Sequence, residues 1–122
     1  MLGYVTIGTN DFEKSKAFYD KVLAGLGGKR GMSGERMQGY VGGSGPMIML
    51  CKPFDGNAAT GGNGTMFALA AASREVVDKV HADALAAGAA DEGAAGERMP
   101  GFYGAYFRDL DGNKFCVFKM GA

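Results

Sequence analysis

Sulfur-bearing side chains alternate along the apolar run Pro46-Met-Ile-Met-Leu-Cys51, and a second cysteine, Cys116, stands in another apolar run near the end of the sequence. Successive side chains of a β-strand point to opposite faces, so Met47, Met49 and Cys51 would share one face. Thioethers and thiols bind soft ions such as Cu(I), and methionine also adapts to flat or irregular apolar ligands. No Met-x-x-Met or Cys-x-x-Cys spacing favours copper. An apolar binding surface and an ordinary filled core are the two main interpretations.

The elements that position these residues belong to a domain of ordinary size and composition. The chain has 122 residues, of which 47% are hydrophobic and 21% are charged, as is typical of a globular protein. Its 13 basic and 13 acidic residues balance, so we expect no nucleic-acid partner and no anionic membrane as a partner. No apolar run reaches the roughly 20 residues that span a bilayer. With two cysteines and no signal-peptide pattern, the sequence predicts a cytoplasmic protein with free thiols.

The same structural plan occurs twice along the chain. Strand-like runs begin at Tyr4 and at Met66, which are 62 residues apart. At the same offset stand Asp11 and Ser73, whose side-chain oxygens can accept a hydrogen bond from an early amide of a helix. Apolar residues with helical spacing follow each of these caps, and glycines follow both helical patterns. The sequence therefore predicts two strand–helix units.

Three strand candidates follow each predicted helix. They lie at 29–33, 36–42 and 46–52 in the first half, and at 89–93, 102–108 and 114–119 in the second. The segment Asp109-Leu-Asp-Gly-Asn113 predicts the turn of a hairpin, because Asp-Gly and Gly-Asn tolerate positive φ. The sequence thus predicts an α+β protein with a single domain over residues 1–122, built from tandem βαβββ modules at about 1–55 and 63–122.

Three stretches, in this order, resemble the vicinal oxygen chelate superfamily, which includes glyoxalase I, bleomycin-resistance proteins and extradiol dioxygenases. They are YVTIGTNDFEKSKAFY (4–19), MFALAAASREVV (66–77) and YFRDLDGNK (106–114). The first is similar to the opening strand and the D-x-x-x-S-x-x-F-Y helix of the family, and the last to its D-P-D-G-N turn. The resemblance implies that the two modules form a cup-shaped, partly closed mixed sheet, commonly in a homodimer.

The resemblance also implies where a catalytic metal would be held. In metal-dependent members the ligands are usually histidine and glutamate, which suit Zn²⁺, Ni²⁺, Mn²⁺ or Fe²⁺. The matching positions here are Tyr4, Met49, Met66 and Cys116, so all four depart from the pattern. We therefore expect no metal and no other cofactor. The only histidine, His81, is expected to be a partly exposed residue of the second helix.

Alternation along the strands predicts which side chains would line the cup that the resemblance implies. The expected lining is Tyr4, Thr6, Met47, Met49, Met66, Ala68, Cys116 and Phe118. Arg98, Tyr103 and Tyr106 are expected to bind a polar end of a ligand, with solvated loop positions as the alternative.

The leading functional hypothesis is a small-molecule-binding protein like the metal-free bleomycin-resistance branch, with a small molecule as its partner and a homodimer as its assembly. The alternative is a lyase or dioxygenase-type enzyme of the same superfamily that uses non-standard ligands. No catalytic residue is assigned, and among the cup positions only Tyr4 could act as an acid or hydrogen-bond donor.

Overall fold

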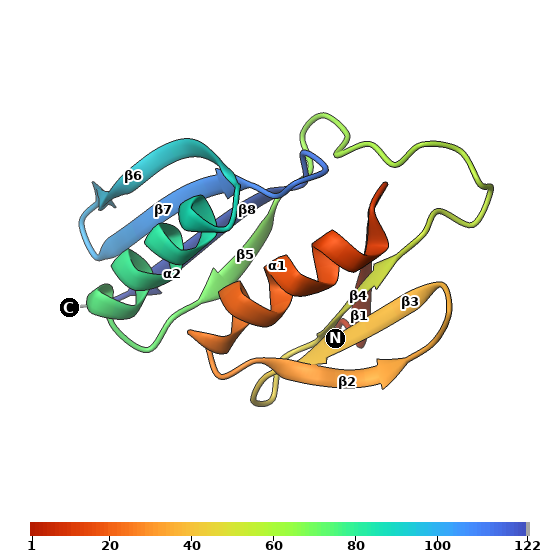
Figure 1. Cartoon of the computed structure of the whole chain (residues 1–122). Helices are drawn as coiled ribbons and strands as arrows, with labels where there is room; N and C mark the ends of the chain where they lie inside the picture. Colours follow the sequence, from red (N-terminus) through yellow and green to blue (C-terminus); the bar gives the residue numbers. More distant parts are fainter. Residues whose placement is uncertain (122) are drawn as a thin grey trace.

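The computed structural model describes residues 1–121 and contains two βαβββ modules (Figure 1). The first module consists of β1 (Tyr4–Gly8), α1 (Phe12–Ala24), β2 (Lys29–Ser33), β3 (Met37–Val41) and β4 (Met47–Cys51). The second consists of β5 (Phe67–Ala70), α2 (Arg74–Ala86), β6 (Ala90–Met99), β7 (Phe102–Arg108) and β8 (Lys114–Met120). This order confirms the α+β class and the tandem modules that the sequence predicts.

Each module has its own four-stranded mixed sheet, with the orders β1-β4-β3-β2 and β5-β8-β7-β6. The first strand of each module runs parallel to the last, and the remaining pairs are antiparallel. Neither sheet closes on itself, and β1 and β5 are edge strands within the part of the chain that the structure describes. The outer edges of β1 and β5 therefore remain unpaired.

Both helices begin where the sequence predicts. The Asp11 carboxylate accepts a hydrogen bond from the Lys14 amide at 3.2 Å, and the Ser73 hydroxyl accepts one from the Val76 amide at 3.2 Å. These bonds satisfy amides that have no partner inside the helix. Each helix has 13 residues, and within residues 1–121 no helix is long and apolar enough to cross a membrane.

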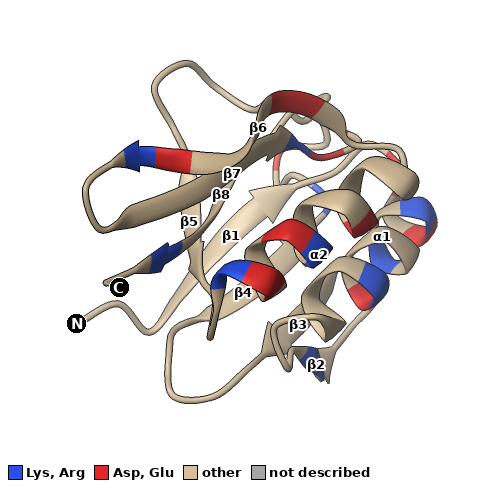
Figure 2. Cartoon of the chain, turned by 90° about the vertical axis from the view of Figure 1, so that its left-hand side faces the viewer, with Lys and Arg blue, Asp and Glu red and all other residues tan. Residues whose placement is uncertain are grey.

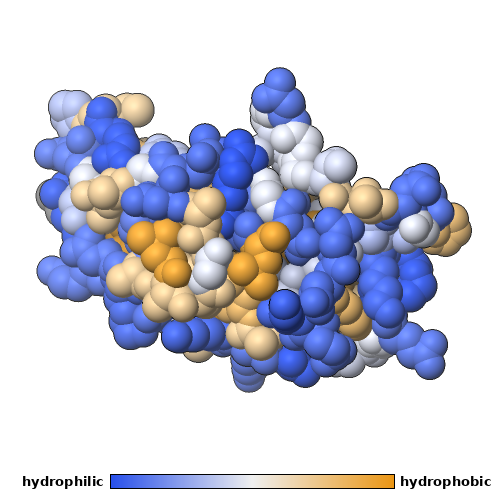
Figure 3. Space-filling view, turned by 45° about the horizontal axis from the view of Figure 1, so that its top comes forward, coloured by the Kyte–Doolittle hydropathy of each residue, from blue (hydrophilic) through white to orange (hydrophobic). Residues whose placement is uncertain are grey.

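The helices lie on one side of the molecule and the sheets on the other (Figure 2). Many strand residues that face the helices are buried, among them Ile7, Leu50, Phe115 and Val117. Charged residues are concentrated on α1, α2 and β6 (Figure 2). A space-filling view shows hydrophilic side chains around an apolar band that crosses one face of the molecule (Figure 3). The helix-facing strand positions thus form the core, as alternation predicts.

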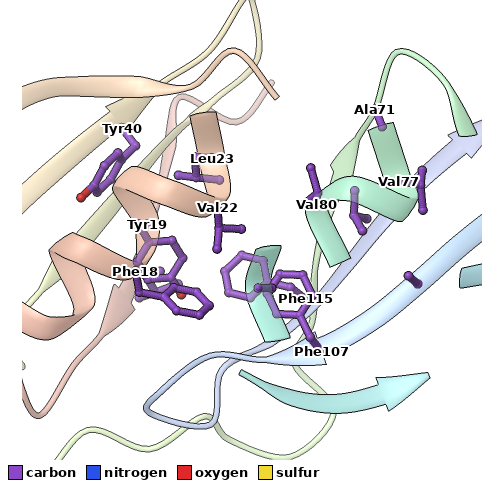
Figure 4. Close-up of a cluster of buried hydrophobic side chains, with 14 of the residues drawn as sticks. Phe18, Tyr19, Val22, Leu23, Tyr40, Ala71, Val77, Val80, Phe107 and Phe115 are labelled. Carbon is purple, nitrogen blue, oxygen red and sulfur yellow. The ribbon is translucent and has the colours of Figure 1, made fainter. Parts of the chain in front are cut away.

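Helix α1 contributes to the core of both modules. Its residues Phe18 and Tyr19 point toward Phe107 and Phe115 of the second sheet (Figure 4). The ring centroids of Phe18 and Phe107 are 6.5 Å apart, and those of Tyr19 and Phe115 are 5.9 Å apart. Tyr19 also contacts Tyr40 of its own module, with the ring centroids 6.0 Å apart. One continuous aromatic cluster therefore joins the modules.

A buried carboxylate in the turn between β7 and β8 also joins the modules. Asp109 accepts hydrogen bonds from the amides of Asp111 and Asn113 and from the Asn113 side chain. The Tyr19 hydroxyl, which comes from the other module, donates to the same carboxylate. Burial, and after it the negative charge of Asp109, raises the pKa of Tyr19 well above its usual value. The hydroxyl therefore keeps its proton and remains a donor at neutral pH.

The same turn makes further contacts with the start of the first module. The Asp111 carboxylate accepts a hydrogen bond from the Asn10 amide at 2.8 Å and another from the Ser15 hydroxyl at 3.0 Å. The Asn113 side chain donates to the Gly8 carbonyl at the end of β1, at 3.0 Å. The predicted hairpin turn is therefore present, and it also holds the N-terminal end of α1.

The linker between β4 and β5 lies on the outside of the molecule (Figure 1) and packs against this turn. A Cβ atom at Gly61 would lie 2.2 Å from the Gly112 carbonyl oxygen, so only glycine fits there. The Asn10 side chain accepts a hydrogen bond from the Ala59 amide at 2.7 Å and donates one to the Ala59 carbonyl at 3.1 Å. The glycine-rich linker is thus held at two points.

Strand β6 is longer than the predicted strand at 89–93, because it continues to Met99. Its sequence, ADEGAAGERM, is rich in glycine and alanine, which have low strand propensity. Pairing with β7 keeps the segment extended, with register shifts that include one between Gly93 and Gly96. Tertiary pairing therefore overrides the local preference.

The prediction that His81 is partly exposed is wrong, because only 7% of the residue is accessible. Its Nε2 atom lies 3.2 Å from an Asp91 carboxylate oxygen and 3.2 Å from the Tyr106 carbonyl oxygen. A buried imidazole needs such partners, and both come from the strands that α2 covers. His81 therefore joins α2 to β6 and β7.

Replacing Tyr19 with Phe should lower the free energy of unfolding by about 2 kcal/mol, because it removes a buried hydrogen bond to a charged group and keeps the ring. The control is Tyr40→Phe, whose hydroxyl donates to the half-exposed Asp20 within one module, at 3.0 Å. That change should cost about 1 kcal/mol. Urea denaturation of the two variants measures both values. Equal losses would contradict a special role for the bond between the modules.

Candidate functional site

The sheet faces that point away from the helices carry exposed side chains. Tyr4 is 60% exposed and Met66 is 45% exposed, whereas Ile7, which faces α1, is 3% exposed. Thr6 and Ala68 on the same faces are also exposed. We refer to these surfaces as the open faces of the first and second module.

The open face of the first module is rich in sulfur. Tyr4 lies opposite Met47, and Thr6 lies opposite Met49, in the parallel pair of β1 and β4. Met49 also lies opposite Gly39 of β3, and a Cβ atom at Gly39 would lie 2.9 Å from the Met49 sulfur. The absence of a side chain at Gly39 therefore lets Met49 lie flat on the sheet, where it is buried.

The open face of the second module is aromatic. Tyr106 lies opposite Cys116, and Gly104 lies opposite Phe118, in the antiparallel pair of β7 and β8. The rings of Phe102 and Phe118 are stacked, with centroids 5.4 Å apart and planes 10° from parallel.

Two basic side chains flank Tyr106 on this face. The guanidinium carbon of Arg98 lies 5.3 Å from the centroid of the Tyr106 ring, and the Lys114 ammonium lies 5.8 Å from it. Burial raises the pKa of the Cys116 thiol, and the neighbouring Tyr106 hydroxyl, Arg98 and Lys114 oppose this shift. Cys116 is therefore a protonated thiol at neutral pH and a weak nucleophile.

The structure brings most of the predicted site residues together in two groups. Tyr4, Thr6, Met47 and Met49 share the open face of the first module, and Arg98, Tyr106, Cys116 and Phe118 share that of the second. Met66 directly precedes β5 at the edge between them.

Tyr103 lies on the opposite side of the second sheet from Tyr106. Its hydroxyl donates to Asp78 of α2 at 2.6 Å, and the Arg74 guanidinium lies 4.8 Å from its ring centroid. The two tyrosines are three residues apart in one strand, so they point to opposite faces. Two residues of the open face, Phe102 and Lys114, were not predicted, although their alternation with Tyr106 and Cys116 is a signal that identifies them.

A groove of about 580 Å³ lies between the two modules, along the edge strands. Val5 and Ile48 line it from the first module, and Met66 to Ala70 line it from the second. Leu23 and Leu26, at the C-terminal end of α1, also contribute. The lining is mainly apolar, and because Val5, Ile48 and Phe67 are helix-facing positions, the groove lies on the helix side of the edge strands.

Two tandem βαβββ modules with open sheet faces define the fold of the vicinal oxygen chelate superfamily. A family model described as a glyoxalase-like domain matches residues 4–118, which is nearly the whole chain. The chain belongs to this glyoxalase-like domain family.

Solved structures show the same relationship. A glyoxalase/bleomycin resistance protein from Albidiferax ferrireducens T118 is 38% identical over 98% of both chains, with a TM-score of 0.91. A hypothetical protein from S. aureus is 28% identical over 95% of this chain and 91% of its own, with a TM-score of 0.76. A glyoxalase/bleomycin resistance protein/dioxygenase family enzyme from Burkholderia phytofirmans PsJN shares the fold, at 24% identity, 97% coverage of both chains and a TM-score of 0.80. Comparison with curated proteins finds no significant match.

The residues at the metal-ligand positions of the superfamily do not fit Zn²⁺, Ni²⁺, Mn²⁺ or Fe²⁺. Tyr4 offers an exposed phenol, Met49 and Met66 offer thioethers, and Cys116 offers a protonated thiol. These ions prefer imidazole, carboxylate and thiolate donors. Within residues 1–121, no group of three or more His, Cys, Asp and Glu side chains is arranged to hold a metal ion. The donor chemistry of the site therefore disagrees with the metal-dependent members.

The purified protein should contain well under one equivalent of Zn, Ni, Mn or Fe, because the four positions offer poor donors for these ions. A chelator should leave its melting temperature unchanged, since only an ion bound to the folded state contributes to stability. Elemental mass spectrometry measures the metal content, and thermal denaturation with and without EDTA measures the change in melting temperature. Stoichiometric metal that EDTA removes with a loss of stability would contradict the prediction.

Proposed function

We propose that the chain binds a small, mainly apolar organic molecule on its open faces and does so without a catalytic metal. The observation that carries the proposal is the exposure of Tyr4 in β1 and of Met66 just before β5, whereas the helix-facing residues of these strands are buried or half-buried. Exposed apolar surface of this kind marks binding sites, and methionine adapts to the shape of a ligand. A groove of about 580 Å³, a volume typical of small-molecule sites, lies beside Met66 on the side of the strand edges that faces the helices.

Family membership supports the same proposal. The related structure from A. ferrireducens is named a glyoxalase/bleomycin resistance protein, so the name leaves both catalysis and binding open. Metal-assisted catalysis needs a Lewis acid and a base near the substrate. None of the four matched positions carries an imidazole or a carboxylate, which favours binding over a lyase or dioxygenase activity. The free thiols Cys51 and Cys116 support a location in the reducing cytoplasm.

The neutral probe N-phenyl-1-naphthylamine tests the binding surface directly. Its fluorescence should rise on titration with the wild-type protein, and Met66→Ala should weaken its binding several-fold by removing apolar contact area. Met32→Ala is the matched control, because Met32 is also exposed but lies on β2, the strand farthest from β1 in its sheet. A probe that does not bind, or that binds equally well to all three proteins, would contradict the proposed site.

The stability of the variants shows whether Met66 belongs to a filled core instead. Met66→Ala should lower the free energy of unfolding by about 1 kcal/mol, as is usual for a point change. Phe67→Ala should lower it by about 3 kcal/mol, because Phe67 packs on Phe115 with ring centroids 5.6 Å apart. Urea denaturation measures both losses. Large, equal losses would place Met66 in the core and remove the main support for binding.

We also propose that the chain forms a homodimer. The unpaired edges of β1 and β5 and the exposed apolar side chains nearby are surfaces that soluble proteins usually cover. Two-fold symmetry is the commonest way to cover such surfaces with a second copy. Light scattering at micromolar concentration should give about twice the chain mass of 12.7 kDa. A mass equal to one chain would refute the dimer.

A further inference from the structure

The open face of the second module carries more positive than negative charge. Arg108 and Lys114 share a single acid, Glu92, at distances of 3.0 and 3.6 Å. Arg98 is exposed, and within residues 1–121 no carboxylate lies within ion-pair distance of it. Because the whole chain has no net charge, this local excess is a property of the face and not of the composition. Such an excess attracts an anion.

Glycines shape the surface on which Arg98 lies. A Cβ atom at Gly93 would lie 3.1 Å from one amino group of Arg98, and a Cβ atom at Gly96 would lie 3.0 Å from the other. The guanidinium also donates to the Ala94 carbonyl, which holds it against the backbone of β6. The group is therefore held close to the strand, beside the ring of Tyr106, and its exposed edge remains available to a ligand.

A flat apolar wall stands next to this guanidinium. The stacked rings of Phe102 and Phe118 lie on the same face, and Gly104 separates Phe102 from Tyr106 along β7. A Cβ atom at Gly104 would lie 2.9 Å from the Phe102 ring and 3.6 Å from the Cys116 sulfur. The missing side chain at Gly104 makes room for the Phe102 ring, which lies over this glycine and extends the apolar wall toward Cys116.

We propose that this face selects a planar aromatic acid, whose ring lies against the wall of Phe102 and Phe118 and whose anionic group bonds to Arg98. A guanidinium matches the two oxygens of a carboxylate or sulfonate, and Lys114 adds a second positive charge. Stacking against the phenylalanine rings favours a flat, conjugated body. The inference rests on the proposed function, because it names the chemical class of the ligand that the open faces bind.

Two fluorescent probes with the same aromatic skeleton test the proposal. 1-Anilinonaphthalene-8-sulfonate carries an anionic group, and N-phenyl-1-naphthylamine lacks it. Arg98→Gln should weaken binding of the sulfonate about tenfold, which is the effect of losing one charge-assisted hydrogen bond, and should change binding of the neutral probe less than about twofold. Arg74→Gln is the matched control, because Arg74 also stacks on a tyrosine but on the opposite face of the same sheet. It should leave both probes unaffected.

The outcomes separate this inference from the proposed function. If the neutral probe binds and Arg98→Gln does not weaken the sulfonate, the selection of an acid is refuted and the apolar site stands. If Arg74→Gln weakens the sulfonate as much as Arg98→Gln, the anion binds elsewhere and the inference is also refuted. If neither probe binds the wild-type protein, both the inference and the proposed function fail. Circular dichroism and urea denaturation of each variant confirm that the compared proteins are folded.

Discussion

The Asp109 carboxylate is the interaction on which the arrangement of this protein depends. It is buried, so its oxygens need several donors, and it receives them from its own turn and from Tyr19 in the other module. One group therefore fixes both the shape of the β7–β8 turn and the position of α1. With α1 held there, Phe18 can pack against Phe107, and the two halves of the chain share one core. The contacts of Asp111 with Asn10 and Ser15 limit rotation about this point.

This arrangement determines which surfaces stay open. Because both helices pack on the same side, each sheet buries one face and exposes the other (Figure 2). The repeated modules have diverged at equivalent positions. His81 stands 62 residues after Tyr19, yet Tyr19 bonds to the other module, whereas His81 bonds to Asp91 and Tyr106 within its own. A repeat with two identical helices would lack this asymmetric connection, so the divergence of these two side chains is part of what joins the modules.

Local signals made most of the fold predictable, and long-range contacts account for what was missed. Asp11 and Ser73 mark the helix starts because a cap depends on residues within one turn, and the Asp-Gly turn is equally local. The full length of β6 depends on its pairing with β7, and the burial of His81 depends on Asp91 and on the backbone of β7, so neither could be predicted from local sequence. Alternation places Tyr106 and Cys116 on one face of the sheet. The prediction groups Tyr103 with Tyr106 because they are close in sequence, whereas strand geometry places Tyr103 on the opposite face.

The two open faces differ in a way that bears on how a ligand would be oriented. The face with Met47 and Met49 is polarisable, and it offers apolar contact area that does not fix the orientation of a ligand. The face with Arg98 and Lys114 offers charge at defined points, and charge discriminates between orientations more strongly than apolar contact does. The loss of histidine and carboxylate from the four matched positions removes the donors that would fix a ligand through a metal. If the proposed binding is correct, another fixed polar group must orient the bound molecule. The exposed guanidinium of Arg98 is the group that we propose for this role, because it is held against β6 and has no carboxylate partner within residues 1–121.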